Sequence, residues 1–354
     1  MEATDKFVVS ESFLDDVHGQ LGCISCHGGQ NEPDMQLAHA GMVIQPSAHG
    51  MCAPCHGDIS ATYETALHNT SAGIAQGLER LAYPNTFNNT PELAHVFEED
   101  CTSCHASCGE CHVSRARIMG GGVHTNHEFV RQPPMYDSCW GCHGARNAGE
   151  YIGNVNGINT IPDVHFTAGM HCADCHDVSN FHGSGEVETG MWDLDTLPSC
   201  YDCHSNVYAD DSPIDAHRVH DPDSMSCQVC HSLPVNNCTS CHVSADGGSS
   251  VSSRMQFKIG LNPNPSEQHP WTYVALRHVP SNADMLSDFG DNLLQNFENI
   301  PSFKMSPSHN VQRVTPQNRE CARCHGNDRI FLQESDLPAD GSPANRDLIV
   351  TEIP

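Results

Sequence analysis

The pentapeptide Cys-x-x-Cys-His occurs ten times in this 354-residue chain, and this repetition constrains the fold more than any other feature. The copies begin at residues 23, 52, 101, 108, 139, 172, 200, 227, 238 and 321, and we number them motifs 1 to 10. They contain all twenty cysteines, which are Cys23, Cys26, Cys52, Cys55, Cys101, Cys104, Cys108, Cys111, Cys139, Cys142, Cys172, Cys175, Cys200, Cys203, Cys227, Cys230, Cys238, Cys241, Cys321 and Cys324. Each copy therefore presents two thiols and one imidazole at one fixed spacing.

The spacing within each motif is the attachment signature of c-type haem. Both thiols bond covalently to the porphyrin, and the histidine takes one axial position on the iron. Zinc ribbons and structural disulfides are the alternatives, but they give no reason for a histidine after every second cysteine. We therefore predict ten covalently bound c-type haems. Their proximal iron ligands are His27, His56, His105, His112, His143, His176, His204, His231, His242 and His325.

With these ten motifs the chain resembles the multihaem c-type cytochromes, specifically their decahaem members. About 35 residues are present for each haem, which is too few to wrap every one in a conventional core. Aromatic residues make up only 6% of the chain, whereas glycine and proline are plentiful. The expected fold is mostly irregular coil with short α-helices and a small β-hairpin, built around a stacked chain of haems.

The second axial position of each iron needs a further ligand, and fifteen histidines lie outside the motifs. Methionine as a ligand would raise the reduction potential, but the positions of the twelve methionines do not indicate that any of them binds iron. A comparison of the two halves of the chain selects five histidines from each half. For example, His127 and His309 are each followed by eleven residues and then by a motif. The predicted distal ligands are His18, His39, His68, His95, His127, His165, His182, His217, His220 and His309. We therefore expect bis-histidine ligation of every iron.

Five other histidines receive weaker interpretations. His49, His124 and His171 are interpreted as surface groups or as neighbours of a ligand. His269 and His278 lie in the large insertion of the second half, and each is an alternative to one of the predicted ligands. A histidine without an iron in its own subunit is also able to ligate a haem of a neighbouring subunit.

The motif spacing predicts two modules of five haems each. The first covers residues 1–150 with haems 1 to 5, and the second covers residues 151–354 with haems 6 to 10, an insertion at 243–308 and an extended tail at 328–354. Three residue steps separate His105 of motif 3 from Cys108 of motif 4, which is at most roughly 10 Å of extended chain. The two porphyrins must touch or nearly touch, as in an electron conductor, because electron transfer falls off steeply with distance.

Four segments outside the motifs show local structure. Residues 255–262 and 272–279 have strand-like composition on either side of turn residues, which predicts a β-hairpin. Residues 283–300 predict an interrupted amphipathic helix that ends before Pro301, and residues 59–83 predict a helix followed by Pro84. The tail ends in an apolar stretch, RDLIVTEIP. This stretch is either a strap over its own domain or a strand that docks on a neighbouring subunit.

A catalytic haem would need an open or exchangeable iron position. All ten motifs end in histidine, whereas multihaem nitrite reductases and octahaem tetrathionate reductases carry a lysine at the active haem. No catalytic residue is therefore predicted. The segment GMHCADCHDVSNFHGSG at 169–185 resembles segments of the octahaem reductase-like family, so a multihaem reductase of a small inorganic substrate stays open as an alternative.

The chain is strongly acidic, with a formal net charge of −28. Nucleic acid and anionic lipid are poor partners for such a surface. Metal cations, redox partner proteins with cationic patches, and Ca²⁺ bridging propionates and carboxylates are compatible with it. No apolar run reaches the roughly 18–20 residues of a membrane helix, and the first residues lack the apolar core of a signal peptide. Because c-type haem is attached outside the cytoplasm, we expect an extracytoplasmic protein whose numbering begins near its mature end.

Three settings known for multihaem cytochromes fit these observations. One is an extracellular filament of self-associated subunits that carries respiratory electrons to external acceptors such as metals. Another is a periplasmic decahaem conduit sheathed by a porin, from which the uneven motif spacing departs. A third is a soluble reductase or shuttle. The filament is favoured, with localisation outside the cell or at its surface.

Overall fold

The computed structural model describes residues 9–43, 48–98, 106–114, 127–155, 158–190, 194, 196–208, 212–233, 257–279, 281–305 and 308–354. Motifs 3 and 9 and one further histidine lie outside these residues, namely Cys101, Cys104, His105, His124, Cys238, Cys241 and His242. The predicted closeness of motifs 3 and 4 therefore stays a prediction.

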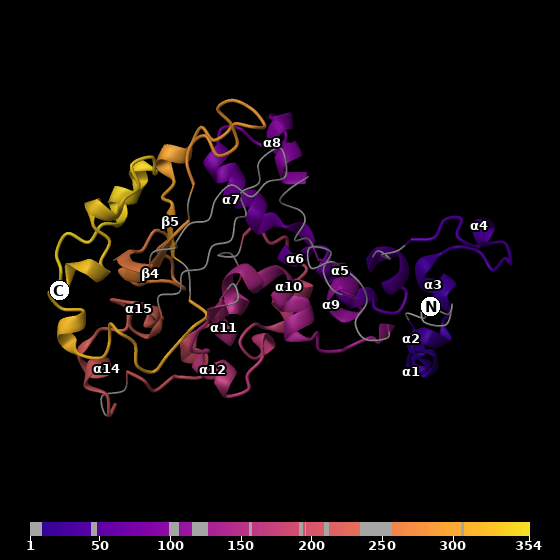
Figure 1. The fold of residues 1–354 in the computed structure, drawn as a ribbon, viewed down its shortest axis with the longest axis horizontal. Helices are drawn as coiled ribbons and strands as arrows, with labels where there is room; N and C mark the ends of the chain where they lie inside the picture. Colours follow the sequence, from indigo (N-terminus) through magenta and orange to yellow (C-terminus); the bar gives the residue numbers. More distant parts are fainter. Residues whose placement is uncertain are drawn as a thin grey trace. The chain divides into compact units, whose positions relative to one another are not determined.

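Short helices and loops dominate the described chain (Figure 1). The α-helices are α1 (Glu11–Asp15), α2 (Val17–Gln20), α3 (Cys23–His27), α4 (Met35–Ala38), α5 (Gly57–Tyr63), α6 (Leu67–Thr70), α7 (Ala72–Ala82), α8 (Pro91–Val96), α9 (Cys108–His112), α10 (Trp140–His143), α11 (Gly149–Ile152), α12 (Val164–Thr167), α13 (Val178–His182), α14 (Asp215–Val219) and α15 (Cys227–His231). The strands are β1 (Asn154–Val155), β2 (Ile158–Asn159), β3 (Phe257–Leu261), β4 (Tyr273–His278) and β5 (Phe303–Met305).

Tighter and wider helical turns complete the regular structure. Turns of 3-10 helix cover Cys172–Asp174, Cys200–Asp202, Phe297–Asn299, Cys321–Arg323, Asp328–Ile330, Glu334–Asp336 and Pro343–Leu348. Turns of π-helix cover Ala48–Cys52, Met135–Cys139 and Gly144–Ala148.

Three of the motifs are themselves complete α-helices, namely α3, α9 and α15. In an α-helix, residues three and four positions apart lie on the same face. The two cysteines of a motif are three apart, and the histidine is four from the first. The helix therefore presents both thiols and the imidazole on one side, as attachment to a single porphyrin requires.

The described chain divides into two compact units, each built from three segments. Unit 1 is Met1–Ala75, Thr102–Cys142 and Cys172–Leu197, and unit 2 is Gln76–Cys101, His143–His171 and Pro198–Pro354. The predicted modules, 1–150 and 151–354, were defined by the spacing of the motifs, whereas the two units are defined by contacts within the fold. The modules stay a prediction.

Unit 1 packs α5 and α6 against α13. Tyr63, the last residue of α5, is buried, and its hydroxyl donates a hydrogen bond of 2.5 Å to the carbonyl oxygen of Ala106. Gly183 follows α13 with φ of +76°, and a Cβ atom there would lie 2.2 Å from the carbonyl oxygen of Thr62. Glycine is therefore required for this close approach of α13 to the end of α5.

The polypeptide of unit 1 buries few apolar side chains. Among its described residues these are Tyr63, Ala66 and Val113. Large apolar side chains are instead exposed along its first segment, at Leu14, Val17, Leu21, Ile24, Met35, Leu37, Met42, Val43, Met51 and Ile59. The chain itself supplies little hydrophobic core to this unit.

Unit 2 contains a three-stranded antiparallel sheet in the order β3-β4-β5. The register pairs Phe257 with Arg277 and Leu261 with Tyr273 across β3 and β4. The predicted hairpin at 255–262 and 272–279 is therefore correct. The prediction did not include β5, which pairs with β4 through Leu276 and Met305, because its three residues give no periodic signal.

A hydrophobic cluster in unit 2 joins α7 and α8 to the segment that follows β4. Its buried members are Ala82, Leu93, Val96, Leu286, Leu293, Leu294 and Phe297. The helix predicted at 283–300 is wrong, since the segment forms turns and a single 3-10 turn at Phe297–Asn299. Asn292 has φ of +53°, which no α-helix accommodates. The spacing of the apolar residues reflects burial in turns rather than a helix.

The helix predicted at 59–83 is present but interrupted, as α5, α6 and α7. Ser71, between α6 and α7, has φ of +55° in the left-handed region. This conformation ends α6, and α7 then continues to Ala82.

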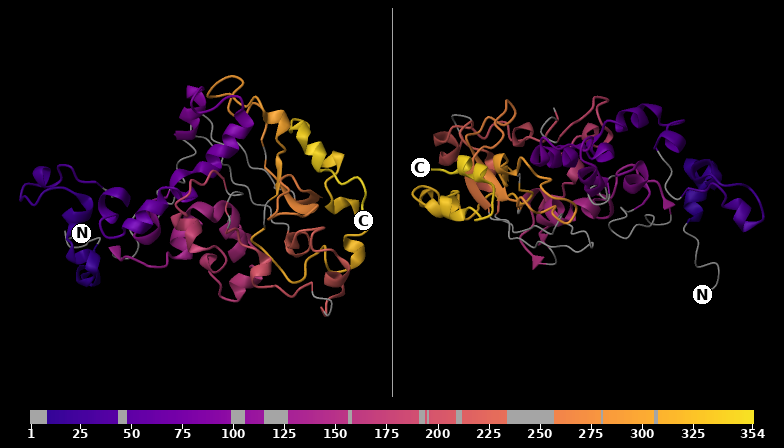
Figure 2. Two further views of the ribbon diagram at one scale, coloured as in Figure 1. Left: turned by 180° about the vertical axis from the view of Figure 1, so that it is seen from behind. Right: turned by 90° about the horizontal axis from the view of Figure 1, so that it is seen from above.

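The C-terminal tail is a strap over unit 2. Val350 and Ile353 pack in a cluster with Val229, Ile259 and Phe331. The Val350 N–H donates to the Leu332 carbonyl at 3.2 Å, and the Gly326 N–H donates to the Pro354 carbonyl at 2.9 Å. Figure 2 shows this yellow segment beside the orange strands. The strap interpretation is confirmed, whereas the strand predicted at the end of the chain does not form.

Within the described residues, the structure contains no helix of the length and apolar character needed to cross a membrane.

Candidate functional site

Six motif histidines each lie beside one histidine from outside the motifs, at almost the same distance. The ring centroids are 5.9 to 6.3 Å apart in every pair. The pairs are His56 with His18, His27 with His127, His112 with His182, His204 with His165, His231 with His217, and His325 with His220. All six partners belong to the predicted distal set. The structure also shows which motif histidine each of these partners lies beside.

This distance fits two imidazoles that bind one metal ion from opposite sides. A metal–imidazole bond is about 2 Å long, and the nitrogen lies roughly 1.1 Å from the ring centroid, so two opposed ligands have centroids roughly 6 Å apart. Rings in simple van der Waals stacking lie closer than this. The donor set of each pair, two imidazoles beside two cysteines, is that of an attached c-type haem with two axial histidines.

His68 of α6 and His176 of motif 6 also lie near enough to interact electrostatically. Burial lowers the pKa of His68, and the nearby charge of His176 lowers it further. Burial also lowers the pKa of His176. Both rings are therefore favoured in the neutral form that binds a metal.

The motif helices α3, α9 and α15 hold their final histidine by the same two hydrogen bonds. In α3, Nδ1 of His27 lies 2.9 Å from the Val43 carbonyl oxygen, and the Val43 N–H donates to the His27 carbonyl at 2.7 Å. His112 makes the same two contacts with Val130, and His231 makes them with Gln312. Each acceptor occupies Nδ1 and so leaves Nε2 as the metal-binding nitrogen. Sequence analysis missed this arrangement because the partners lie 16 to 81 residues away.

Two distal candidates are held by aspartates instead. Asp16 caps α2 and accepts from the backbone N–H and Nδ1 of His18. These bonds lower the pKa of Asp16, the backbone bond most. Asp163 caps α12 and makes the same contacts with His165. The sequence analysis did not single out the two aspartates. The tripeptide Asp-Val-His, which occurs at 16–18 and at 163–165, is the sequence signal that marks them.

Cysteines of different motifs also lie in contact. A hydrogen bond between their thiols joins Cys52 to Cys108 and raises the pKa of Cys108. The same contact joins motif 5 to motif 6 through Cys139 and Cys172, and motif 7 to motif 8 through Cys200 and Cys227. In each case the contact brings together cysteines of two different motifs.

Weaker electrostatic contacts extend these series. Burial raises the pKa of Cys26, and the nearby Cys52 raises it further. The hydrogen bond with Cys172 lowers the pKa of Cys139, and the nearby Cys111 opposes this shift. Burial raises the pKa of Cys230, and the nearby Cys324 raises it further. The thiol contacts thus join motif 2 to motif 4 and motif 5 to motif 6 in unit 1, and motif 7 to motif 8 in unit 2.

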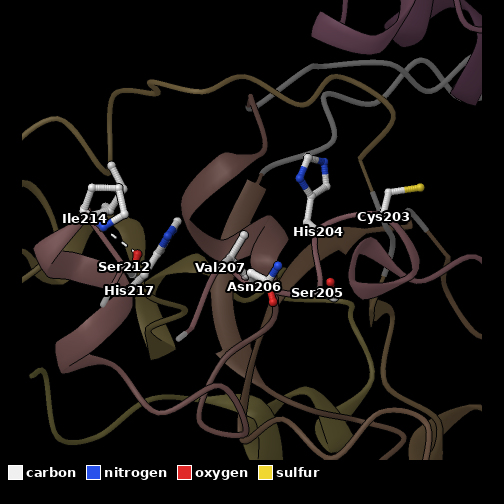
Figure 3. A pocket seen from close by; sticks show the side chains of 9 residues that line it. Cys203, His204, Ser205, Asn206, Val207, Ser212, Ile214 and His217 are labelled. Carbon is white, nitrogen blue, oxygen red and sulfur yellow. Dashed lines mark hydrogen bonds between the residues drawn. The ribbon is translucent and has the colours of Figure 1, made fainter. Parts of the chain in front are cut away.

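A cavity of about 380 Å³ in unit 2 lies between two of the histidine pairs (Figure 3). Its lining includes His204, which faces His165, and His217, which faces His231. Cys203 of motif 7 and the side chains of Val207 and Ile214 also line it. The cavity therefore brings a motif cysteine and one histidine from each of two histidine pairs into one space.

The other predicted distal ligands lie apart from these pairs. His39 and His95 are exposed, and among the described residues no motif histidine lies against either ring. His309 donates its backbone N–H to Glu150 at 3.1 Å. The predictions for these three histidines stay predictions.

Two histidines outside the predicted set lie in unit 2. The ring of His278 lies 4.8 Å from that of Phe303, and its buried Nε2 has no hydrogen-bond partner among the described residues. His269 lies against Trp271 with centroids 5.4 Å apart.

Comparison with known proteins gives one match. A family model described as cytochrome c554 and c-prime matches residues 178–232. This stretch contains motifs 7 and 8 together with His182, His217 and His220. No curated protein and no solved structure matches the chain. The match supports a multihaem c-type cytochrome with covalently bound haem and a role in electron transfer.

Proposed function

We propose that this protein transfers electrons outside the cytoplasm through a chain of ten closely spaced c-type haems, each with two histidine ligands. The observation that carries the proposal is the set of six pairs in which a motif histidine and a distal candidate lie 5.9 to 6.3 Å apart. Bound haem supplies reversible one-electron chemistry, which these residues lack.

The residues of the chain would perform four tasks. The cysteine pairs anchor each cofactor covalently, and the opposed histidines occupy both axial positions. This ligation excludes small molecules from the metal and gives a low reduction potential, because no methionine raises it. The Nδ1 hydrogen bonds of His27, His112 and His231 fix the ring orientations. The close approach of cysteines from different motifs, such as Cys52 of motif 2 and Cys108 of motif 4, would keep their cofactors close.

The same geometry favours a carrier over a reductase. A reductase needs one iron with an open or exchangeable position, whereas in the paired sites a second imidazole faces the motif histidine. Electron donors and acceptors would be redox proteins or extracellular metals, in keeping with the net charge of −28. Calcium bound between carboxylates and propionates is a further proposal from this charge.

We expect His18→Ala to produce one high-spin haem out of ten. The ring of His18 faces His56 of motif 2 at 6.3 Å, and its removal leaves that iron with one protein ligand. Electron paramagnetic resonance of the oxidised protein would detect the high-spin signal, and mass spectrometry would verify that all ten haems remain attached.

The matched control is His18→Met. A thioether is also a strong axial ligand, so this variant is expected to stay low-spin with one haem at a higher potential. An entirely low-spin His18→Ala protein with ten haems would contradict the assignment of His18. A high-spin haem in the unaltered protein that binds nitrite or hydroxylamine would favour the reductase.

We further propose that the subunits assemble into an extracellular filament. The exposed apolar side chains of unit 1, the acidic surface and the exposed His39 and His95 support self-association. Electron microscopy of the undenatured protein is expected to show filaments with a regular axial repeat. Discrete particles at every concentration tested would contradict the filament and favour a shuttle, a reductase or a porin-sheathed conduit.

A further inference from the structure

We propose that Asp16 and Asp163 are positioning residues that lower the reduction potentials of the haems at motifs 2 and 7 by giving His18 and His165 anionic hydrogen-bond partners. The inference rests on the proposed function, because it requires these two histidines to be axial ligands. It adds that the cofactors at these two motifs are tuned differently from those whose ligand rings bond a backbone carbonyl oxygen.

The two aspartates hold their histidines in the same way. Asp16 Oδ1 accepts from the His18 backbone N–H at 2.9 Å and lies 2.8 Å from Nδ1 of its ring. Asp163 Oδ1 makes the corresponding contacts with His165 at 2.7 Å and 2.9 Å. Each carboxylate therefore fixes both the backbone and the ring. The opposite nitrogen, Nε2, is left for the metal.

The rings then face the histidines of two motifs. The centroid of His18 lies 6.3 Å from that of His56 in motif 2, and the centroid of His165 lies 6.2 Å from that of His204 in motif 7. Motifs 2 and 7 are each the second motif of a predicted five-haem module. The aspartate–histidine contact thus recurs at the second motif of both predicted modules.

Four other proposed ligand rings have neutral partners. Nδ1 of His27, His112, His220 and His231 lies 2.7 to 3.0 Å from a backbone carbonyl oxygen. A carboxylate draws the Nδ1 proton more strongly than a carbonyl does, and so makes the imidazole a better electron donor. A more electron-rich ligand stabilises the oxidised iron, which carries the larger positive charge. The potential falls as a result.

The surroundings of the two aspartates differ. The side chain of Asp16 is 46% exposed, whereas that of Asp163 is 2% exposed. Water screens the charge of Asp16, so the larger effect is expected at Asp163. Asp163 also accepts the Val311 N–H on Oδ2 at 2.5 Å, which ties this carboxylate to a second segment of unit 2.

The test compares Asp16→Asn with a matched variant, Asp177→Asn. Asparagine caps a helix as well as aspartate does, and its carbonyl oxygen still accepts from Nδ1, so only the charge is lost. Asp177 begins the tripeptide Asp-Val-Ser and caps α13 but bonds Ser179 instead of an imidazole. A redox titration followed by the NMR signals of the haem methyl groups gives a midpoint for each haem.

In Asp16→Asn we expect one midpoint to rise by at least a tenfold change in its reduction equilibrium, about 59 mV for one electron. Asp177→Asn is expected to shift every midpoint by less. Asp163→Asn should shift a different haem by more than Asp16→Asn does. Because an asparagine amide opposes the Val311 N–H there, Asp16→Asn is the decisive variant if Asp163→Asn fails to fold.

The outcomes separate this inference from the proposed function. Unchanged midpoints in Asp16→Asn, or a shift no larger than in Asp177→Asn, would overturn the inference provided that His18→Ala still yields one high-spin haem. A His18→Ala protein that remains low-spin would overturn the ligation on which both depend.

Discussion

Without haem attachment, the chain is expected to leave unit 1 unfolded. The described part of unit 1 buries only Tyr63, Ala66 and Val113 among its apolar side chains. Isolated helices shorter than about 12–15 residues are marginal in water, and the longest described helix, α7, has 11 residues. Covalent attachment and metal ligation must therefore supply the folding free energy of this unit.

Hydrogen–deuterium exchange of a chain produced in a cell without the attachment machinery tests this expectation. Peptides from α5 and α13 should exchange at the rate of an unfolded chain, whereas the same peptides are protected in the haem-loaded protein. Peptides from β3 and β4 serve as the internal reference, because their cluster contains buried Ile259, Phe331 and Val350. Equal protection of α5 with and without haem would contradict the prediction.

An Arg277→Met variant is expected to lose about 3–5 kcal/mol of folding free energy. Arg277 on β4 donates to Glu150 of α11, and Glu150 is fully buried. The second carboxylate oxygen of Glu150 accepts the His309 N–H at 3.1 Å. Methionine replaces the bulk of the arginine but leaves the buried carboxylate without its cation. Urea unfolding of the haem-loaded protein, followed by circular dichroism, measures the loss.

The control is an exposed ion pair of the same unit. Arg346 and Glu334 lie 3.0 Å apart, and their side chains are 61% and 63% exposed. Exposed pairs contribute about 0–1 kcal/mol, so Arg346→Met is expected to change stability little. If Arg277→Met lost no more than Arg346→Met, the buried pair would not stabilise unit 2.

Local predictions succeeded where the pattern and the packing agree. The hairpin of β3 and β4 has strand-forming residues on both sides of turn residues, and the two strands pair as predicted. The segment 283–300 has helical spacing of apolar residues, yet Leu286, Leu293 and Phe297 reach the cluster with α7 and α8 from turns. Tertiary burial overrode the local preference there.

The distal histidines show the same division. Comparison of the halves selected His18, His127 and His182 as candidates, and the structure places each of them opposite a motif histidine. The sequence did not predict which motif histidine each candidate faces, because a pair such as His27 with His127 joins residues a hundred positions apart. The two Asp-Val-His tripeptides are visible in the sequence. Only the structure shows that the aspartate bonds Nδ1 of the histidine and leaves Nε2 towards the motif histidine.

By itself, the sequence determined the chemistry of the sites, since the identity and spacing of two thiols and an imidazole define the attachment of each haem. It also determined the local geometry of motif helices such as α3, where positions three and four apart share a face. Only the tertiary structure decided which histidines oppose each other, which thiols meet, and which imidazoles have carboxylate partners. These contacts join distant segments, and their free energy arises from packing and ligation that no local pattern records.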